Sequence, residues 1–189
     1  MPEITRCKWP GMTYPLYIKY HDEEWGVPQH DDIKLFEALI LDGFQAGLSW
    51  FTILKKREGY RKAFDGFSPE KISTYDDKKV EELMADTRIV RNRLKILSAI
   101  GNAKSFLEIR DESGSFDRFI WSFVKHNPIK NHWDMDNQIP SKTVESDLMI
   151  KELYRRGSKF VGSTICYAFM QGVGMVNDHV RTCFRYEQV

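Results

Sequence analysis

Apolar residues recur every three or four positions along most of the chain, which is the spacing of helices that bury one face. The first clear run, Ile33, Phe36, Leu39 and Ile40, follows Asp31, a residue type suited to start a helix. The alternation typical of β-strands is nearly absent. The pattern therefore predicts an all-α fold. Helices are expected over residues 31–40, 47–57, 76–84, 89–107, 116–123, 144–155 and 162–173, with one more starting at Ser68.

Two stretches lack the helical spacing. Residues 7–27 are rich in Pro, Gly, Tyr and Trp, and we expect an ordered coil laid over the helices. Residues 127–142 contain two prolines and many polar side chains, which is typical of a surface loop. No repeat, linker or low-complexity tract interrupts the chain, so residues 1–189 are expected to form one compact domain.

Composition narrows the choice of function. The chain has 189 residues, 29% of them charged, and a formal net charge of +1. A general nucleic-acid binder is usually more basic, so a role on DNA would require local basic patches. No apolar run approaches the roughly 18–20 residues of a membrane span, and the first residues do not resemble a signal peptide. These features predict a cytoplasmic protein without a membrane partner.

Two cysteines and two histidines could form a metal site between the two ends of the chain. The cysteine total, three, is odd, which argues against a disulfide framework and for a reducing compartment. His179 and Cys183 are four residues apart, so a turn of helix would bring both to one face. With Cys7 and His21 they make a Cys₂His₂ set suited to a structural, tetrahedral zinc. The alternative is hydrogen-bonded histidines and small core cysteines, the interpretation given to Cys166 in its apolar helix.

The junction at residues 41–51 is the strongest candidate for chemistry. Small residues there let another molecule approach the backbone closely. Asp42 could accept hydrogen bonds from an amine, and Trp50 offers a flat face for stacking. The alternative is a simple helix corner with Leu48 and Trp50 buried in the core.

Basic residues and helix starts indicate where a nucleic acid could bind. The turn at residues 86–91 joins two expected helices, and free amides at the start of the second could hold a phosphate. Arg88, Arg91 and Arg93 cluster there, residues 55–57 form a second basic patch, and residues 162–164 open a later helix. Basic residues on exposed helices are also commonly no more than a solvated face.

Several longer motifs identify a family resemblance. They are Tyr20-His21-Asp22 with Trp25-Gly26-Val27-Pro28, Gln45-Ala46-Gly47-Leu48-Ser49-Trp50, Leu54-Lys55-Lys56-Arg57, Trp121-Ser122-Phe123-Val124, Lys159-Phe160-Val161-Gly162 and Val176-Asn177-Asp178-His179. With these motifs the chain, from Cys7 to Cys183, resembles the bacterial DNA-3-methyladenine glycosylase I family, which belongs to the helix–hairpin–helix glycosylases.

The resemblance implies a monomeric repair enzyme that acts on double-stranded DNA containing alkylated adenine. It would flip out 3-methyladenine and hydrolyse its N-glycosidic bond without a lyase step. It implies one structural zinc, held by Cys7, His21, His179 and Cys183. The implied base pocket consists of Trp9, Tyr17, Tyr20, Asp42 and Trp50, with Asp42, Tyr20 and Trp50 as the catalytic residues. The implied DNA contacts are Gln45, Gly47, Leu48, Arg88, Arg91, Ser163 and Thr164.

Two positions depart from the family pattern. The family's pocket carboxylate is usually Glu, and Asp42 is one methylene shorter, so the backbone shifts, a water bridges the gap, or discrimination is weaker. The hairpin position of Arg88 is often Gly or another small residue. Two other functions remain open at this point, a non-catalytic, zinc-stabilised reader of alkylated DNA and a zinc hydrolase with an open metal position.

Overall fold

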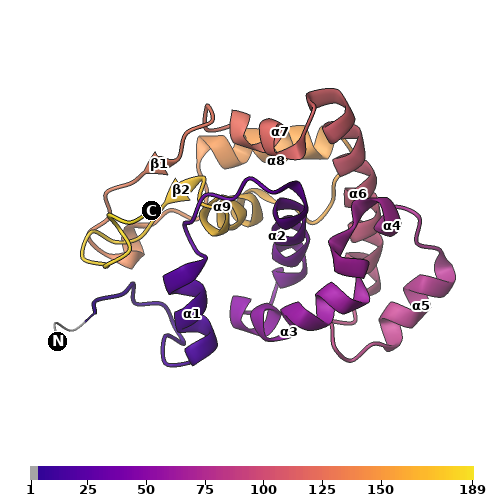
Figure 1. Cartoon of the computed structure of the whole chain (residues 1–189), viewed down its shortest axis with the longest axis horizontal. Helices are drawn as coiled ribbons and strands as arrows, with labels where there is room; N and C mark the ends of the chain where they lie inside the picture. Colours follow the sequence, from indigo (N-terminus) through magenta and orange to yellow (C-terminus); the bar gives the residue numbers. More distant parts are fainter. Residues whose placement is uncertain (1–3) are drawn as a thin grey trace.

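Helices dominate the part of the chain that the computed structural model describes, residues 4–189 (Figure 1). Within that range there are nine α-helices, two 3-10 helices and one pair of two-residue parallel strands. The α-helices are α1 (Pro15–Glu23), α2 (Asp32–Gln45), α3 (Trp50–Ala63), α4 (Pro69–Ile72), α5 (Asp77–Ala85), α6 (Arg93–Ser113), α7 (Phe116–Ser122), α8 (Val144–Arg155) and α9 (Ser163–Gly172). The 3-10 helices are Asp65–Phe67 and Asp136–Gln138, and the strands are β1 (Ile129–Lys130) and β2 (Val176–Asn177). The all-α prediction is confirmed.

Helix α2 runs through the core and packs against α3, α6, α7 and α9 (Figure 1). Its buried residues include Leu35, Phe36, Leu39 and Phe44. The helix begins where the sequence predicted, because the Asp31 side chain accepts a hydrogen bond from the free amide of Lys34. Because α2 is anchored on several sides, the residues at its C-terminal end are held in fixed positions.

Side-chain caps define most other helix starts. Each cap oxygen accepts a bond from the amide three residues ahead, which satisfies one of the unpaired groups at a helix start. The capping residues are Ser49, Ser68, Asp76, Asn92, Ser115 and Thr143.

The structure corrects several of the expected boundaries. Helix α2 continues to Gln45, so residues 41–45 of the predicted junction are helical. Residues 7–27 are not all coil, because α1 lies within them. Helix α3 starts at Trp50 rather than at Gly47, because Gly47 has a φ of 78°, outside the helical range. Helix α6 starts at Arg93, so Ile89 belongs to the preceding turn. The loop expected at residues 127–142 is present, with only β1 and a short 3-10 helix inside it.

The turn between α5 and α6 is fixed to α3 by three residues. The Lys56 ammonium donates to the carbonyl of Thr87 at 2.7 Å, and the Val90 amide donates to the Tyr60 hydroxyl at 3.1 Å. Gly59 lies between them, where an added Cβ would come within 2.6 Å of the Arg88 carbonyl oxygen. The helix–hairpin–helix unit is therefore held against the rest of the protein by close backbone contact.

Gly59→Ala is expected to lower the free energy of unfolding by about 1–3 kcal/mol, because the added methyl group overlaps the Arg88 backbone. Gly101→Ala in α6 is the matched control. Nothing lies within 4 Å of its Cβ position, so it should raise stability by about 0.5–1 kcal/mol. Urea unfolding of both variants makes the comparison. Equal effects at the two glycines would contradict the contact between α3 and the hairpin.

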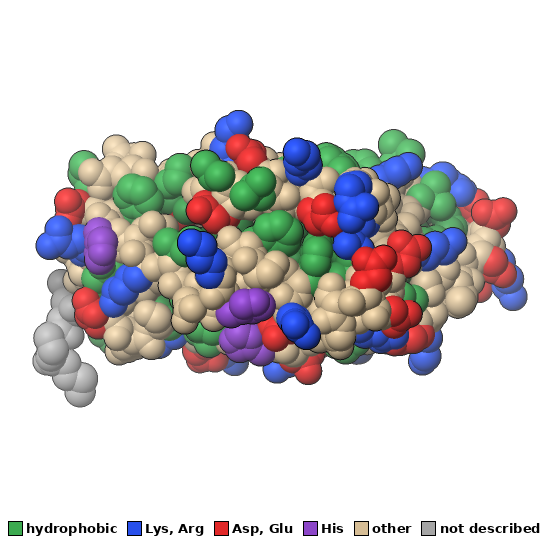
Figure 2. Space-filling view, turned by 90° about the horizontal axis from the view of Figure 1, so that it is seen from above, with side chains coloured by type: hydrophobic (Ala, Val, Ile, Leu, Met, Phe, Trp, Pro, Cys, Tyr) green, Lys and Arg blue, Asp and Glu red, His purple; other side chains and the backbone are tan. Residues whose placement is uncertain are grey.

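None of the helices within residues 4–189 combines the length and the apolar character that a membrane crossing requires. Figure 2 shows one face of the molecule, on which lysine and arginine side chains are mixed with aspartate and glutamate. The surface in this view therefore has no broad region of a single charge, in keeping with the net charge of +1.

Candidate functional site

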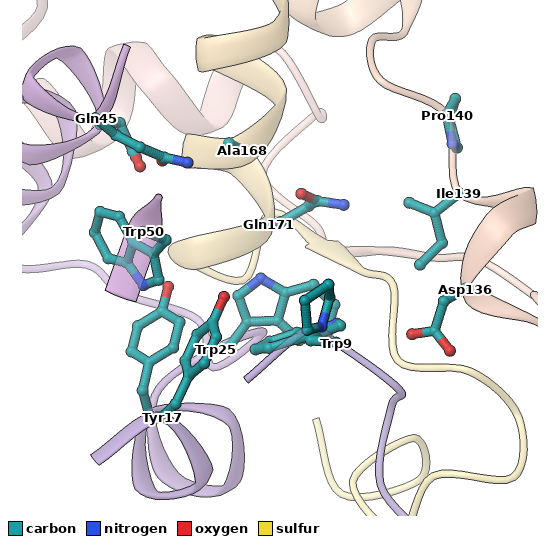
Figure 3. A pocket seen from close by; sticks show the side chains of 13 residues that line it. Trp9, Tyr17, Trp25, Gln45, Trp50, Asp136, Ile139, Pro140, Ala168 and Gln171 are labelled. Atoms are coloured by element: carbon teal, nitrogen blue, oxygen red, sulfur yellow. The ribbon is translucent and has the colours of Figure 1, made fainter. Parts of the chain in front are cut away.

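A cavity of about 380 Å³ lies where α1, the end of α2, the start of α3 and α9 meet (Figure 3). Its lining includes all five residues of the implied base pocket, Trp9, Tyr17, Tyr20, Asp42 and Trp50. In the close-up, Trp50 and Gln45 lie on one side, and Asp136, Ile139 and Pro140 lie on the other. Three of the five residues come from the N-terminal segment and two from the α2–α3 junction. The structure thus brings together residues that are well separated in the sequence.

Asp42 is 7% exposed and occupies the last turn of α2. Burial raises the pKa of Asp42 well above its usual value, and no cation or hydrogen-bond donor within residues 4–189 offsets that effect. The Trp50 indole N–H is also buried without a hydrogen-bond partner in the described chain. Unpaired polar groups are costly inside a protein, so their position in a cavity wall indicates that they bind a ligand.

Aromatic rings form most of the wall around Asp42. The rings of Tyr20 and Trp50 lie 5.5 Å apart at 52°, and those of Tyr17 and Tyr20 lie 6.5 Å apart at 27°. The Tyr20 pKa is raised well above its usual value, mainly by burial and then by the charge of Asp42, and so its hydroxyl remains a hydrogen-bond donor. The cavity therefore presents flat apolar faces, one donor hydroxyl and one carboxyl group, which suit a flat, cationic heterocycle.

A second cavity of about 470 Å³ shares Tyr20, Asp42 and Trp50 with the first. It is lined by charged pairs, including Arg57 with Glu24 and Arg61 with Glu37. Trp9 and Tyr17 do not line it. Only the first cavity has the full aromatic set, and we take that cavity as the candidate base pocket.

Two polar residues of the pocket were not predicted from the sequence, Asp136 in the loop at residues 127–142 and Gln171 in α9. Gln171 is held by a buried acid. Its amide donates to the buried carboxylate of Asp178 at 2.8 Å. Asp178 also accepts bonds from Tyr167, Trp133 and Asn131. The sequence offered one signal for this network, the motif at residues 176–179. That motif contains Asp178, but the prediction used only its histidine, His179.

Cys7, His21, His179 and Cys183 form a buried cluster in which the four ligand atoms lie within 4.8 Å of one another. The Sγ atom of Cys183 is 3.6 Å from Nε2 of His21 and 3.5 Å from Nδ1 of His179. A tetrahedral zinc with usual bond lengths would place sulfur and nitrogen ligands about 3.5 Å apart. The donor set and its spacing therefore fit a metal ion.

The surrounding groups orient the two histidines for such an ion. The other ring nitrogen of His21 lies 2.8 Å from a carboxylate oxygen of Asp22, and Arg6 in turn donates to that carboxylate. The second nitrogen of His179 lies 3.1 Å from the carbonyl oxygen of Trp25. Outer hydrogen bonds of this kind are usual for histidines that bind metal.

One detail of the metal prediction was wrong. Residues 178–183 are not helical, and His179 and Cys183 face each other across a turn closed by a bond from the Cys183 amide to Val180. The two ends of the chain meet beside this turn, where the Phe184 amide donates to the Thr5 carbonyl. Figure 1 shows the N-terminal and C-terminal segments on the same side of the molecule. Cys166 is buried in the core, as predicted.

The base pocket and the metal cluster share a wall. The Trp9 ring lines the cavity on one side, and its centre lies 4.9 Å from the His21 ring. Trp9 also contacts Trp25 edge to face at 4.5 Å. The position of Trp9 in the pocket therefore depends directly on the clustered residues.

The implied DNA contacts lie in three places. Gln45 lines the pocket, while Gly47 and Leu48 follow in an exposed loop, where Leu48 is 40% exposed rather than buried in a core.

Arg88 and Arg91 are exposed on the α5–α6 hairpin, and Arg88 is paired with Asp86. No residue of the described hairpin has a positive φ, so the turn accommodates the Arg88 side chain without strain. Ser163 and Thr164 open α9, whose start lacks a side-chain cap in the described chain, and the Ser163 hydroxyl bonds to Ser146.

The second basic patch expected at residues 55–57 stays a prediction, but its three cations all have partners within the protein. Lys56 binds the hairpin carbonyl described above, and Arg57 forms a two-bond ion pair with Glu24. Lys55 lies over the Phe51 ring at 4.8 Å. Lys56 and Arg57 thus join α3 to neighbouring segments, a role that the spacing of residues in the sequence does not indicate.

Known proteins resemble the chain over nearly its whole length. The profile of the methyladenine glycosylase family matches residues 9–186. DNA-3-methyladenine glycosylase 1 of Escherichia coli (strain K12) is 50% identical over 183 residues, which cover 97% of each protein. A crystal structure of 3-methyladenine DNA glycosylase I matches with a TM-score of 0.92 at 49% identity, over 95% of this chain and 98% of that one.

A third similarity involves a bound base. The crystal structure of a tyrosine-to-phenylalanine variant of 3-methyladenine DNA glycosylase I, in complex with 3-methyladenine, matches with a TM-score of 0.90. The identity there is 33%, over 92% of this chain and 94% of that one. By sequence and by fold, this chain belongs to the methyladenine glycosylase family.

Proposed function

We propose that this protein is a DNA-3-methyladenine glycosylase I that removes 3-methyladenine from alkylated DNA by hydrolysing its N-glycosidic bond. The observation that carries the proposal is the buried, unpaired carboxyl group of Asp42 in an aromatic cavity. It occurs in a chain half identical to a glycosylase of that name. We further propose that residues 1–189 act as one glycosylase domain, as a monomer, in the reducing cytoplasm.

The chemistry of the lesion determines what the protein must supply. An adenine methylated at N3 carries positive charge and leaves the sugar as a neutral base, so no strong acid is needed to protonate it. The protein must instead extrude the base, select it by its charge, and stabilise a cationic sugar in the transition state. The bond between C1′ and the base breaks with its electron pair passing to the base, and a water molecule adds to C1′ and loses a proton. No protein nucleophile is required, and we propose hydrolysis without a covalent protein–DNA intermediate or strand cleavage.

Each pocket residue has a role in this scheme. Trp50 would stack on the cationic ring, a contact worth about 1–2 kcal/mol. Asp42 would accept a hydrogen bond from the exocyclic amine and favour the positive charge. Tyr20 would donate to another ring edge, while Trp9 and Tyr17 complete the walls.

The DNA contacts follow from where the exposed elements lie. Gln45 and Leu48 would fill the space that the base leaves in the duplex, with Gly47 allowing close approach of the strand. Arg88 and Arg91 would neutralise backbone phosphates beside the hairpin. The amides of Ser163 and Thr164 at the start of α9 would hold a further phosphate.

We propose that the metal is zinc and that its role is structural. Cys7, His21, His179 and Cys183 would hold the ion, and the orientation of both histidines supports this assignment. Four protein ligands leave no open coordination position, which disfavours a zinc hydrolase. When bound, the ion supplies a link between the two chain ends and takes no part in hydrolysis.

A base-release assay on duplex DNA containing 3-methyladenine tests the proposal. Free 3-methyladenine should appear in solution while the strand stays intact until the abasic site is cleaved by alkali. A reader of alkylated DNA would bind the duplex and release nothing. Borohydride treatment should trap no protein–DNA adduct, and a trapped adduct would contradict hydrolysis without a covalent intermediate.

A further inference from the structure

Lys95 is a buried cation that the scheme above does not use. It is the third residue of α6, and it is 6% exposed. Its ammonium donates to the carbonyl of Phe44 at 2.9 Å and to the carbonyl of Ala46 at 2.6 Å. Burial lowers the pKa of Lys95, so the charge is held there at some cost. An apolar side chain would fill the same space without the free-energy cost of burying a charge, so packing alone does not explain a lysine at this position.

The two carbonyls belong to the end of α2, where a helix leaves its last oxygens unpaired. The neighbouring oxygens are satisfied locally, because Gly43 accepts from the Ala46 amide and Gln45 accepts from the Leu48 amide. The chain then leaves the helix through Gly47, whose φ is 78°. Lys95 thus pairs the two carbonyls that this turn leaves free, and its charge is favourable at the C-terminal end of the α2 dipole.

The position of Lys95 connects two separate parts of the DNA-facing surface. Its helix begins directly after the hairpin that carries Arg88 and Arg91, and the carbonyls it binds flank Gln45. Helix α3 holds the other side of both parts, since Ser49, the last residue of the loop, caps α3 and Lys56 binds the hairpin. The hairpin and the loop at residues 45–49 are therefore held at a set spacing by one ammonium and one helix.

We infer that Lys95 is a positioning residue for base extrusion, which sets the loop carrying Gln45 and Leu48 relative to the hairpin that grips the DNA backbone. The inference rests on the proposed function. Phosphates held at the hairpin fix the register of the duplex, so the distance from the hairpin to the loop decides whether the loop reaches the displaced base. Lys95 touches neither the base nor the sugar in this scheme.

The test compares Lys95→Met with Lys104→Met, which removes an exposed lysine from the same helix. For Lys95→Met the kcat for release of 3-methyladenine from duplex DNA should fall about ten-fold or more, because two hydrogen bonds to a charged group are lost. The affinity for free 3-methyladenine, read from tryptophan fluorescence, should stay within about two-fold, because the pocket walls are unchanged. Lys104→Met should resemble the wild type in both measurements.

A duplex with a tetrahydrofuran abasic analogue opposite 2-aminopurine reports insertion of the loop directly. Lys95→Met should lose most of the fluorescence change on binding while its affinity for undamaged duplex stays the same. Lys95→Arg, which keeps the charge and donors, should recover part of both signals. If Lys95→Met does not fold, Lys95→Gln makes the same comparison with a shorter reach to the carbonyls.

The outcomes separate this inference from the proposed function. An inactive wild type would refute the proposed function, whatever Lys95 does. An active wild type with an equally active Lys95→Met would refute the positioning role. An equal loss of duplex activity and free-base affinity in Lys95→Met would also refute it, since that result indicates general damage to the fold.

Discussion

Asp42→Asn should lower the rate of 3-methyladenine release from duplex DNA by about 100-fold, a loss typical of removing one charged contact to a transition state. An amide carries no charge to balance the cationic base, and one of its two ends presents a donor to the exocyclic amine. The folded protein should persist, because the Asp42 carboxyl group has no internal partner to lose within residues 4–189. Single-turnover release of the free base is the measurement.

Two controls sharpen this result. Asp147→Asn removes an exposed carboxylate on α8 and should leave the rate unchanged. Asp42→Glu keeps the charge and supplies the longer side chain that is usual in the family, so its rate should remain within about ten-fold of the wild type. Release at the wild-type rate by Asp42→Asn would remove this residue from the mechanism.

Because the pKa of Asp42 is raised, both the rate of base release and the stability of the fold should depend on pH. As the pH falls through that raised pKa, the carboxyl group becomes neutral and loses its attraction for the cationic base, so wild-type release should slow. The unfolded chain loses this proton at the usual, lower pKa, and so folding stability declines as the pH rises between the two values. Asp42→Asn should therefore show no such step in its residual rate and should be more stable than the wild type at neutral pH.

Removal of the proposed zinc should have the largest effect on stability. Treatment with a mercurial reagent and a chelator should release one zinc per chain and lower the thermal midpoint by more than about 10 °C, because structural zinc contributes much of the folding free energy at such sites. Cys183→Ser should behave like the stripped protein. The physical reason is that the ion would join residues from both ends of the chain around one point.

His126→Ala is the control for the metal experiment, since this histidine is exposed in the turn between α7 and the loop at residues 127–142. It should keep its zinc and its midpoint. Elemental analysis of the purified protein decides the identity of the ion. A protein that contains no metal and melts at the same temperature after chelation would show that the cluster is held by hydrogen bonds alone.

Much of the fold could be predicted because most helices bury an apolar stripe and start at a polar cap. Asp31, Ser68 and Asp76 are the clearest cases. Helix α1 was missed because its buried residues are Tyr20 and His21, which face the pocket and the metal cluster rather than an apolar core. Periodicity detects burial against apolar neighbours, and it gives no signal for a helix whose buried face is polar and aromatic.

The candidate site was only partly accessible from the sequence. The family motifs indicated the five pocket residues, and the structure places them around one cavity. Gln171 and Lys95 were not identified, because their significance lies in bonds to Asp178 and to the carbonyls of Phe44 and Ala46. Hydrogen bonds between residues far apart in the chain cannot be predicted from the local spacing of apolar and polar residues.

The shared wall between the pocket and the metal cluster has a consequence for synthesis of the protein on the ribosome. Trp9, Tyr17 and Tyr20 are made first, yet the residues that fix their segment, His179 and Cys183, are made last. A nascent chain can dock α1 on α3, through the pair of Glu24 with Arg57, before the last residues exist to hold the segment that precedes α1. The wall of the pocket that Trp9 forms is therefore completed only when translation is nearly finished, and an incomplete product released early would lack it.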